Sequence, residues 1–301
     1  MNLQLVHEMG ESVSARFRDR TLFRYVYQPD LPVEQSPKPY FHPICSLSGN
    51  RLSNLSPNDH PWHHALCHTI TRVGDVNFWG GPSYREEGGY LFRNDNGRQV
   101  HRSWTRLEPG DRSVSLEHQL EWIGPDESVL LEEARGIEVT VLDDESAWVL
   151  AFSSNLRNVA GRLLDLGNYH SSFGLAGSHY TGLLMRMTRE YVFPCGDPQM
   201  KILAAGGLIG VDAVHGANVR WAALTGRHDE SLDRTTSIFI DDSPGQPVHW
   251  FVRDQLPAVG FSFQFDRDQR LEVDEELVLR HRLIFAEGVL DADQIEALVE
   301  G

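Results

Sequence analysis

The stretch GIEVTVLDDESAWVLAFSSNL, residues 136–156, decides the fold class. On both sides of the break at residues 143–144, large apolar residues alternate with smaller or polar ones. A period of two places every second side chain on the same face of a β-strand, and a break rich in Asp is typical of a turn. The stretch therefore predicts two neighbouring strands with a short connection.

The same alternation continues outward in both directions. Further segments rich in Val, Ile, Leu, Phe and Thr lie at residues 12–19, 22–29, 112–124, 219–226, 235–241 and 259–288. Gly, Asp, Asn and Pro separate these segments at roughly ten-residue intervals, a pattern typical of antiparallel sandwiches and barrels. We therefore expect an all-β protein, a large antiparallel β-sandwich with little helix, as a single domain over residues 1–301.

The clearest helical signal lies at the end of the chain, in LDADQIEALVEG, residues 290–301. Asp291 or Asp293 could cap a short helix there, because an Asp side chain can accept the first free backbone N–H groups. Such a helix would carry Ile295, Leu298 and Val299 on one face.

Composition limits the partners of the protein. The formal net charge of −16 repels phosphate backbones and anionic lipid, so we expect neither nucleic acid nor a membrane as a partner. No apolar run approaches the ~18 residues that span a bilayer, and the N-terminal sequence lacks the pattern of a signal peptide. Exposed sandwich edges make a homodimer plausible.

The cysteines indicate the compartment. Cys45, Cys67 and Cys195 are odd in number and far apart, which favours free thiols in a reducing cytoplasm over a disulfide framework. Cys67 lies between histidines and could serve as a thiolate ligand or nucleophile, but its apolar neighbours favour a buried thiol without a chemical role.

The segment NDHPWHHALCHTI, residues 58–70, holds four of the fourteen histidines of the chain. In a helix or in a strand alike, His60, His64 and His68 would share one face, with His63 pointing elsewhere. Imidazole suits a divalent metal and also acid/base chemistry near neutral pH. The spacing matches no standard zinc motif, and a polar loop whose histidines bond to the backbone is the plain structural alternative.

Other candidate residues lie in loops rich in Gly, Ser or Pro. In PYFHP, residues 39–43, the two prolines could hold His42 beside the histidine segment, or the aromatic residues could fill the core. NFWGGPSYREEGGY combines aromatic rings with Arg and Glu, a mixture common where sugars bind, and the favoured structural alternative is an exposed loop. The candidate substrate-binding residues are Tyr40, His63, Trp79, Glu87, His170, Tyr180, Arg186, His249 and Arg253.

Nucleotide-binding and hydrolase signatures are missing from the sequence. No G-x-G-x-x-G follows a strand pattern, and neither G-x-x-x-x-G-K-[ST] nor G-x-S-x-G occurs. These observations set aside dinucleotide-binding proteins, P-loop proteins and serine hydrolases with a nucleophile elbow.

The order of several segments resembles a known family. PKPYFHPICSLSGNRLS, DHPWHHALCHTITRVGDVNFW, GSHYTGLLMRM, TTSIFIDDSPGQPVHWFVR and LVLRHRLIFAEG look like the bacterial family labelled "methane oxygenase PmoA-like", otherwise a domain of unknown function. The resemblance runs from about residue 23 to about residue 288, and its most specific element is P-Y-F-H-P followed by D-H-P-x-H-H. The usual H-P-H-H-x-G-L appears here as H-P-W-H-H-A-L, so Trp62 and Ala65 depart from the pattern.

This resemblance implies a galactose-mutarotase-like β-supersandwich and carbohydrate chemistry. Our first hypothesis is an enzyme, an epimerase, lyase or hydrolase that acts on a sugar or an oxidised glycoside. In it, His60 and His64 would transfer protons, His42 and His68 would orient the substrate or a metal, and Arg186 or Arg253 would bind a charged or keto group.

Two further hypotheses stay open. A metal-dependent oxygenase or hydrolase would bind zinc, manganese or iron through His60, His64 and His68, or through two histidines with Glu86 or Glu87. A non-catalytic sugar-binding module would rely on Trp62 and Trp79 and would tolerate replacement of the histidines.

Overall fold

The computed structural model describes residues 3–192, 200–245 and 248–301, and Cys195 lies outside them. The described residues form mostly β-strands. The strands are β1 (Gln4–Glu8), β2 (Ser12–Phe17), β3 (Arg20–Val26), β4 (Tyr40–Ile44), β5 (Leu66–Thr69), β6 (Arg72–Val73), β7 (Ser83–Arg85), β8 (Gly89–Leu91), β9 (Arg98–Pro109), β10 (Ser113–Ile123), β11 (Val129–Val141), β12 (Ala147–Asn158), β13 (Leu164–Gly167), β14 (Gly182–Arg186), β15 (Lys201–Ala204), β16 (Leu208–Ile209), β17 (Trp221–Arg227), β18 (Arg234–Asp241), β19 (His249–Arg253), β20 (Ala258–Ser262), β21 (Gln269–Leu271) and β22 (Glu276–Glu287). The helices are α1 (Tyr169–Phe173), α2 (Val211–Val214) and α3 (Ala292–Glu300), with 3-10 turns at Val33–Gln35, Arg189–Val192 and Ala205–Gly207.

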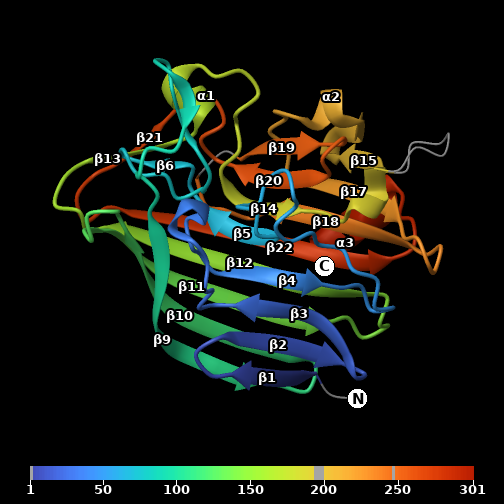
Figure 1. The fold of residues 1–301 in the computed structure, drawn as a ribbon. Helices are drawn as coiled ribbons and strands as arrows, with labels where there is room; N and C mark the ends of the chain where they lie inside the picture. The colour runs from blue at the N-terminus through green and yellow to red at the C-terminus, as the bar shows by residue number, and fades with distance from the viewer. Residues whose placement is uncertain (1–2, 193–199, 246–247) are drawn as a thin grey trace.

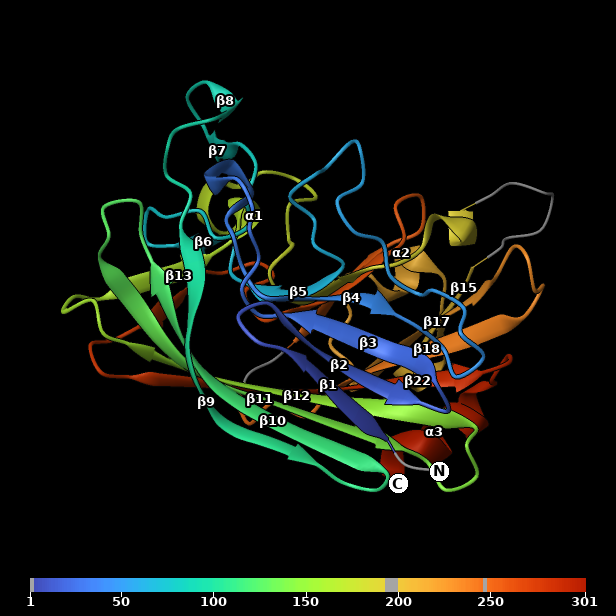
Figure 2. The same ribbon diagram turned by 60° about the horizontal axis from the view of Figure 1, so that its bottom comes forward.

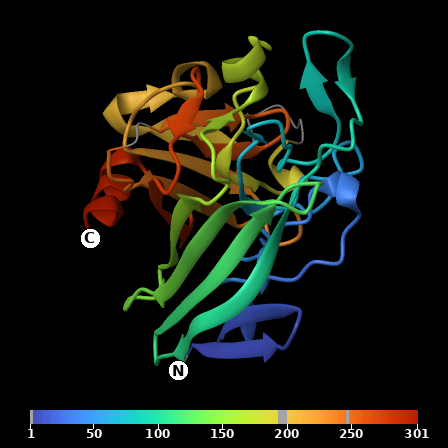
Figure 3. The same ribbon diagram turned by 90° about the vertical axis from the view of Figure 1, so that its left-hand side faces the viewer.

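Two large antiparallel sheets pack face to face in the described part of the chain (Figures 1 and 2). One has eight strands in the order β1-β2-β3-β4-β5-β14-β20-β19, and the other has nine in the order β16-β15-β17-β18-β22-β12-β11-β10-β9. A three-stranded sheet, β21-β13-β6, and the β7–β8 hairpin lie at one end, where the hairpin projects from the body (Figure 3). The predicted large antiparallel β-sandwich with little helix is confirmed.

The predicted strand pair at residues 136–156 is confirmed as the end of β11 and most of β12, which are neighbours in the nine-stranded sheet. Their inward-facing side chains pack against the eight-stranded sheet. Phe152 contacts the His68 ring of β5, and Trp148 stacks on Phe23 of β3, with all four side chains nearly or fully buried. Alternation thus assigns one face of each strand to the core between the sheets.

The predicted C-terminal helix is also confirmed, as α3. Asp291 is its cap and accepts a hydrogen bond from the backbone N–H of Gln294. Ile295 and Val299 are buried against Ile238 and Ile284, on the face of the nine-stranded sheet that points away from the main core. No helix within the described residues has the length and apolar character needed to cross a bilayer.

A charged pair is buried in the middle of the core. Glu133 and Arg135 occupy inward positions of β11, with side chains no more than 1% exposed, and two guanidinium nitrogens lie 2.8 Å from the carboxylate oxygens. The Arg135 guanidinium also donates to the Tyr25 hydroxyl of β3 and to Gln99 of β9, each at 3.0 Å. The Trp122 indole N–H donates to Glu133 at 2.8 Å. The network therefore joins both sheets through directional bonds.

The charge state of Glu133 depends on its neighbours. Burial alone would raise the pKa of Glu133, but the charge of Arg135 and the adjacent His68 ring outweigh burial and hold it well below the usual range. The carboxylate is therefore ionised, and it lies 3.4 Å from Nδ1 of His68. A buried ion pair of this kind is costly to break, because the remaining charge has no water to solvate it.

Replacing Arg135 by Met tests this dependence. We expect Arg135→Met to lower the free energy of unfolding by about 3–5 kcal/mol, because Glu133 keeps a buried charge without its counter-ion. Urea unfolding monitored by tryptophan fluorescence measures the change. As a control, Arg157→Met alters an exposed guanidinium of neighbouring β12 and should shift stability by no more than about 0.5 kcal/mol. A loss below about 1 kcal/mol for Arg135→Met would contradict the network's structural role.

Candidate functional site

A pocket of about 440 Å³ lies on the outer face of the eight-stranded sheet, over β14, β19 and β20. We call it the aromatic pocket. Its lining consists of His60, Trp62, His63, Trp79, Gly80, Pro82, Tyr90, Gly177, Tyr180, Leu184, Arg186, Phe251, Arg253, Leu256 and Ala258.

Strand alternation builds the floor of the pocket. Leu184, Phe251 and Ala258 belong to three different strands and pack together with Trp79 in a small cluster of their own. Their immediate neighbours along the strands, such as Met185, point the other way into the main core. The same strands therefore hold the sandwich together with one face and form the pocket floor with the other.

The loop at residues 77–82 forms one wall of the pocket. The buried Asn77 side chain accepts hydrogen bonds from the backbone N–H groups of Trp79 at 2.9 Å and of Gly80 at 3.0 Å. Gly81 has φ +70°, and a Cβ atom there would lie 2.4 Å from the Trp62 ring. Glycine is thus required for both the turn and the close approach of Trp62.

Lys38 stabilises this wall through hydrogen bonds to backbone carbonyls. Its side chain is 1% exposed, and its amine donates to the backbone carbonyls of Gln35 at 3.1 Å, Ser36 at 2.9 Å and Trp79 at 2.8 Å. Burial lowers the pKa of Lys38 to about 8. Three carbonyl acceptors satisfy its three donors, so Lys38 supports the position of Trp79 and has no hydrogen-bonding capacity left for a ligand.

Aromatic rings surround the space above the floor. The ring centroids of Trp79 and Tyr180 are 4.6 Å apart, and those of Tyr180 and Phe251 are 6.0 Å apart. The hydroxyl of Tyr90, from the β7–β8 hairpin, lies 3.1 Å from that of Tyr180. Burial raises the pKa of Tyr180 well above its usual value, so its hydroxyl stays protonated and can donate. The pocket thus combines flat apolar surfaces with polar edges.

Two guanidinium groups reach the pocket, and they differ in their partners. Arg253 donates to the Gly177 carbonyl at 2.8 Å and lies over the Phe251 ring at 4.6 Å. Arg186 is only 3% exposed, yet its Nε and Nη2 atoms have no hydrogen-bond partner. Burial lowers the pKa of Arg186, and the Asp59 charge opposes that shift. Among the described lining residues there is no carboxylate to neutralise these cations.

Two of the four clustered histidines line the pocket, in different states. His60 Nδ1 lies 3.0 Å from Oδ2 of Asp59, which also pairs with Arg189 at 2.6 Å. His63 packs edge-on against Trp79, with ring centroids 5.2 Å apart, and its Nδ1 atom is buried without a partner. Burial, together with the charge of Arg186, lowers the pKa of His63 to about 3, so this imidazole is neutral at physiological pH.

The comparisons with known proteins identify a family. A family of unknown function, DUF6807, matches residues 12–300. The chain belongs to this family. No curated protein matches the DUF6807 chain. None of the matches named here carries the methane oxygenase label, so that part of the resemblance stays a prediction.

Solved structures of sugar-acting enzymes resemble the DUF6807 chain weakly. The GH36 α-galactosidase AgaB from Geobacillus stearothermophilus has 14% sequence identity and a TM-score of 0.46, and the match covers 95% of this chain and 41% of that one. Galactose 1-epimerase from Lactobacillus acidophilus NCFM has 9% identity and a TM-score of 0.44, with 95% and 99% covered. This chain thus spans about two fifths of the α-galactosidase. Similarity at this level does not extend to activity.

The predicted convergence of His60, His64 and His68 is wrong for this structure. The expectation assumed one regular backbone from residue 60 to 68, but turns precede β5, and Ala65 has φ +50°. His60 therefore lines the aromatic pocket, while His64 turns behind the wall, where its Nε2 lies 3.1 Å from Gln35 Oε1. His68 points into the core beside Glu133. Three different surroundings cannot provide one metal site.

Other predicted residues divide between the pocket and the rest of the molecule. His63, Trp79, Tyr180, Arg186 and Arg253 are brought together in the pocket, as the substrate-binding hypothesis requires.

The remaining candidates lie outside the aromatic pocket. His42 lines a separate pocket with Arg51, and burial, together with the Arg51 charge, lowers its pKa to about 4. Tyr40 is buried against His64, with ring centroids 5.4 Å apart. Glu86 and Glu87 are exposed in the turn between β7 and β8.

His249 in β19 and His170 in α1 do not line the pocket. His249 Nδ1 lies 2.8 Å from the Gly216 carbonyl oxygen. His170, at the start of α1, lies beside His179 and Asp266. Cys45 and Cys67 are free and buried.

Sequence reasoning missed Tyr90 and the pocket-floor residues. Phe251 shares a face with Arg253 in β19, so the alternation in HWFVR carries a signal for its position. Nothing in the sequence indicated that the β7–β8 hairpin would bring Tyr90 to Tyr180 across 90 residues.

The lowered pKa of His63 predicts a pH dependence of stability. Between pH 7.5 and 5.5 the unfolded chain protonates this histidine near its ordinary value of 6.5, whereas the folded chain does not until about pH 3. The unfolded state binds more protons, so stability falls as the pH falls, by about 1.4 kcal/mol for this group. Urea unfolding of wild type and His63→Gln at both pH values measures it. An equal pH-dependent loss in both proteins would refute the assignment.

Proposed function

We propose that the aromatic pocket binds a sugar that carries a carboxylate or keto group, and that the protein is a carbohydrate-active enzyme that transfers a proton at the adjacent carbon. The observation that carries this proposal is the convergence of aromatic rings with Arg186, whose buried Nε and Nη2 atoms have no hydrogen-bond partner. The aromatic rings would bind the sugar ring, and the guanidinium would bind its carboxylate or keto group.

The aromatic half supports a sugar ring. The C–H groups of a pyranose form an apolar face that packs on a flat aromatic ring, and the hydroxyls project from its edge. Trp79, Tyr180 and Phe251 supply such flat surfaces, and the Tyr180 hydroxyl supplies a polar edge beside them. The volume of about 440 Å³ lies within the range of small-molecule sites.

The cationic half supports a charged or keto group on that sugar. A buried guanidinium without partners is costly, and a carboxylate restores its hydrogen bonds in a two-pronged arrangement. The protein as a whole carries a net charge of −16, so it would repel an anionic ligand unless cations gather locally. Arg186 and Arg253 provide that local positive charge in a lining without carboxylates among the described residues.

His60 is positioned for the proton transfer. The Asp59 carboxylate beside Nδ1 favours the proton on that atom, which leaves a lone pair on Nε2. In the proposed step, Nε2 takes the proton from the carbon next to the carboxylate, and the C–H electron pair moves onto the carboxylate oxygens. Arg186 stabilises the charge that develops there. If water protonates the same carbon from the opposite face, the result is an epimerisation, and His60 returns its proton to the hydroxide that remains. If His60 Nε2 instead gives its proton to the β-oxygen substituent, that substituent leaves as an alcohol or water, which completes an elimination.

Hydrolysis fits the pocket less well. Glycosidases commonly use two carboxyl groups on either side of the scissile bond. The described lining of the pocket contains none, since Asp59 lies behind His60 and is held by Arg189. Epimerisation or elimination therefore fits the residues better than hydrolysis.

Ligand binding tests the role of Arg186. We expect glucuronate or galacturonate to bind at least tenfold more tightly than glucose or galactose in isothermal titration calorimetry. Arg186→Met should remove that preference, because a hydrogen bond to a charged group contributes about 1.5–3 kcal/mol. Arg186→Lys keeps the charge and serves as the matched variant, with an intermediate loss. Equal affinity of wild type for the acidic and the neutral sugars would contradict the proposal.

Isotope exchange tests the role of His60. In D₂O, wild type should introduce deuterium at C5 of a bound hexuronate, and His60→Gln should slow this exchange about 10²-fold or more, as expected for loss of a general base. Proton NMR of the sugar follows the exchange directly. His7→Gln, on remote β1, is the matched control and should exchange at the wild-type rate. Binding without exchange in wild type would indicate a sugar-binding module and no enzyme.

A further inference from the structure

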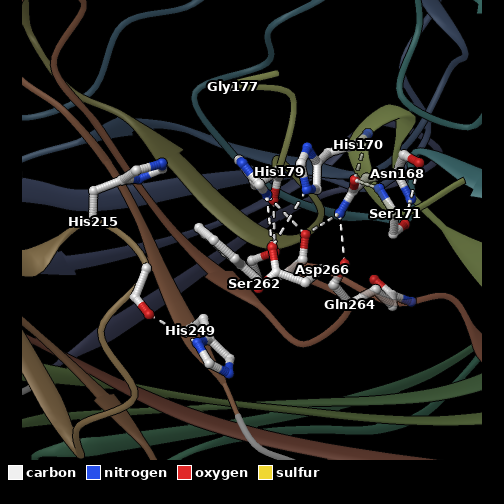
Figure 4. A network of polar contacts seen from close by, with 12 residues as sticks. Asn168, His170, Ser171, Gly177, His179, His215, His249, Ser262, Gln264 and Asp266 are labelled. Carbon is white, nitrogen blue, oxygen red and sulfur yellow. Dashed lines mark hydrogen bonds and ion pairs between the residues drawn. The ribbon is translucent and has the colours of Figure 1, made fainter. Parts of the chain in front are cut away.

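A second cluster of polar side chains lies outside the aromatic pocket, where two loops meet. His170 and His179 belong to the segment between β13 and β14, and Asp266 lies in the connection from β20 to β21. Figure 4 shows the three side chains pointing toward one another from these two segments. We call them the His–His–Asp cluster.

The three side chains offer ligand atoms at short separations. One nitrogen of each imidazole and one carboxylate oxygen all lie within 4.8 Å of one another, and no other such group of three occurs in the described part of the chain. His170 Nε2 lies 3.5 Å from Asp266 Oδ1. Ligands about 2.1 Å from a tetrahedral metal are about 3.4 Å apart, so the His170–Asp266 pair already has the spacing of two metal ligands.

Backbone carbonyls orient both imidazole rings. The Nδ1 atom of His170 lies 3.2 Å from the Leu175 carbonyl oxygen, and that of His179 lies 2.8 Å from the Phe265 carbonyl oxygen. Hydrogen bonds of this kind fix the tautomer of metal-binding histidines and hold the ring in place. For His170, the bond leaves Nε2, which faces Asp266, with the free lone pair.

The two segments are also bonded to each other, so the cluster is held before any ligand arrives. The Asn168 side chain caps α1 and donates to the Gln264 carbonyl at 2.6 Å. The Ser262 hydroxyl donates to the His179 carbonyl at 2.6 Å, and the Thr181 hydroxyl donates to Gln264 Oε1 at 2.8 Å. A site built in this way loses little conformational freedom on binding.

Charge and exposure also suit a metal ion. The imidazole centroids of His170 and His179 are only 3.9 Å apart, so charging both rings would place two cations in contact. Neutral imidazole is the form that binds metals. The Asp266 side chain is 63% exposed, which leaves a route from solvent.

We propose that the His–His–Asp cluster binds a divalent transition metal, zinc above all, through two imidazoles and one carboxylate, with water at the remaining positions. Imidazole ligands select zinc and its neighbours over magnesium and calcium, which prefer oxygen ligands. This inference is independent of the proposed function, because it concerns other residues and a different ligand.

Metal titration of tag-free protein, stripped with EDTA and dialysed, tests the proposal. In calorimetry at pH 7.5, Zn²⁺ should bind with one equivalent per chain, and Co²⁺ should give visible absorption bands characteristic of imidazole and carboxylate ligands. Asp266→Asn, which changes a mostly exposed group and should fold normally, is expected to weaken Zn²⁺ binding at least tenfold. His170→Gln should do the same.

His249→Gln provides the matched control, because His249 also bonds a backbone carbonyl through Nδ1 but has no part in the cluster. It should bind Zn²⁺ as wild type does, and Mg²⁺ should not compete. The absence of Zn²⁺ binding by wild type would overturn the proposal. Binding that Asp266→Asn and His170→Gln leave unchanged would also overturn it, since the metal would then lie elsewhere. Circular dichroism confirms that each variant is folded.

Discussion

The buried bond between Glu133 and Arg135 is the constraint on which the sandwich depends. Contacts between aliphatic and aromatic side chains are non-directional, whereas the Arg135 guanidinium makes four directional hydrogen bonds to three side chains. Because these partners come from β3, β9 and β11, the pair sets how the two sheets lie over each other. The opposite face of the eight-stranded sheet, which carries the aromatic pocket, is held in place by the same contacts.

Two sets of contacts fix the positions of the residues that line the aromatic pocket. The strands β14, β19 and β20 fix the floor through alternation, and side chains that bond to backbone groups then fix the loops above it. Asn77 and Lys38 are the main examples, because each holds several peptide groups of the wall around Trp79. Arg186 differs from both, since its buried Nε and Nη2 atoms have no hydrogen-bond partner. That contrast separates the structural cation Lys38 from the cation that we propose binds a ligand.

Sequence reasoning reached the fold class because alternation is a local property that survives into the structure. Alternation predicted the strand pair around residues 136–156, and a capping Asp, either Asp291 or Asp293, predicted the C-terminal helix. Five of the nine predicted substrate-binding residues line the pocket, so the composition of their segments was a correct basis for choosing these five. The histidine cluster was misread because the positive φ of Ala65 interrupts the periodicity on which the prediction relied. The proximity of His170, His179 and Asp266 depends on how two distant loops dock, and no local pattern encodes that.

The position of the pocket on the outside of the sheet has a consequence for how such a protein can change. Its walls come from insertions between strands, among them the β7–β8 hairpin that brings Tyr90 (Figures 2 and 3). Lengthening or exchanging such insertions alters the ligand's surroundings without opening a void between the sheets. Selection for a new substrate and selection for a stable scaffold therefore act on largely separate residues, and laboratory evolution directed at these loops can proceed without first raising the stability of the core.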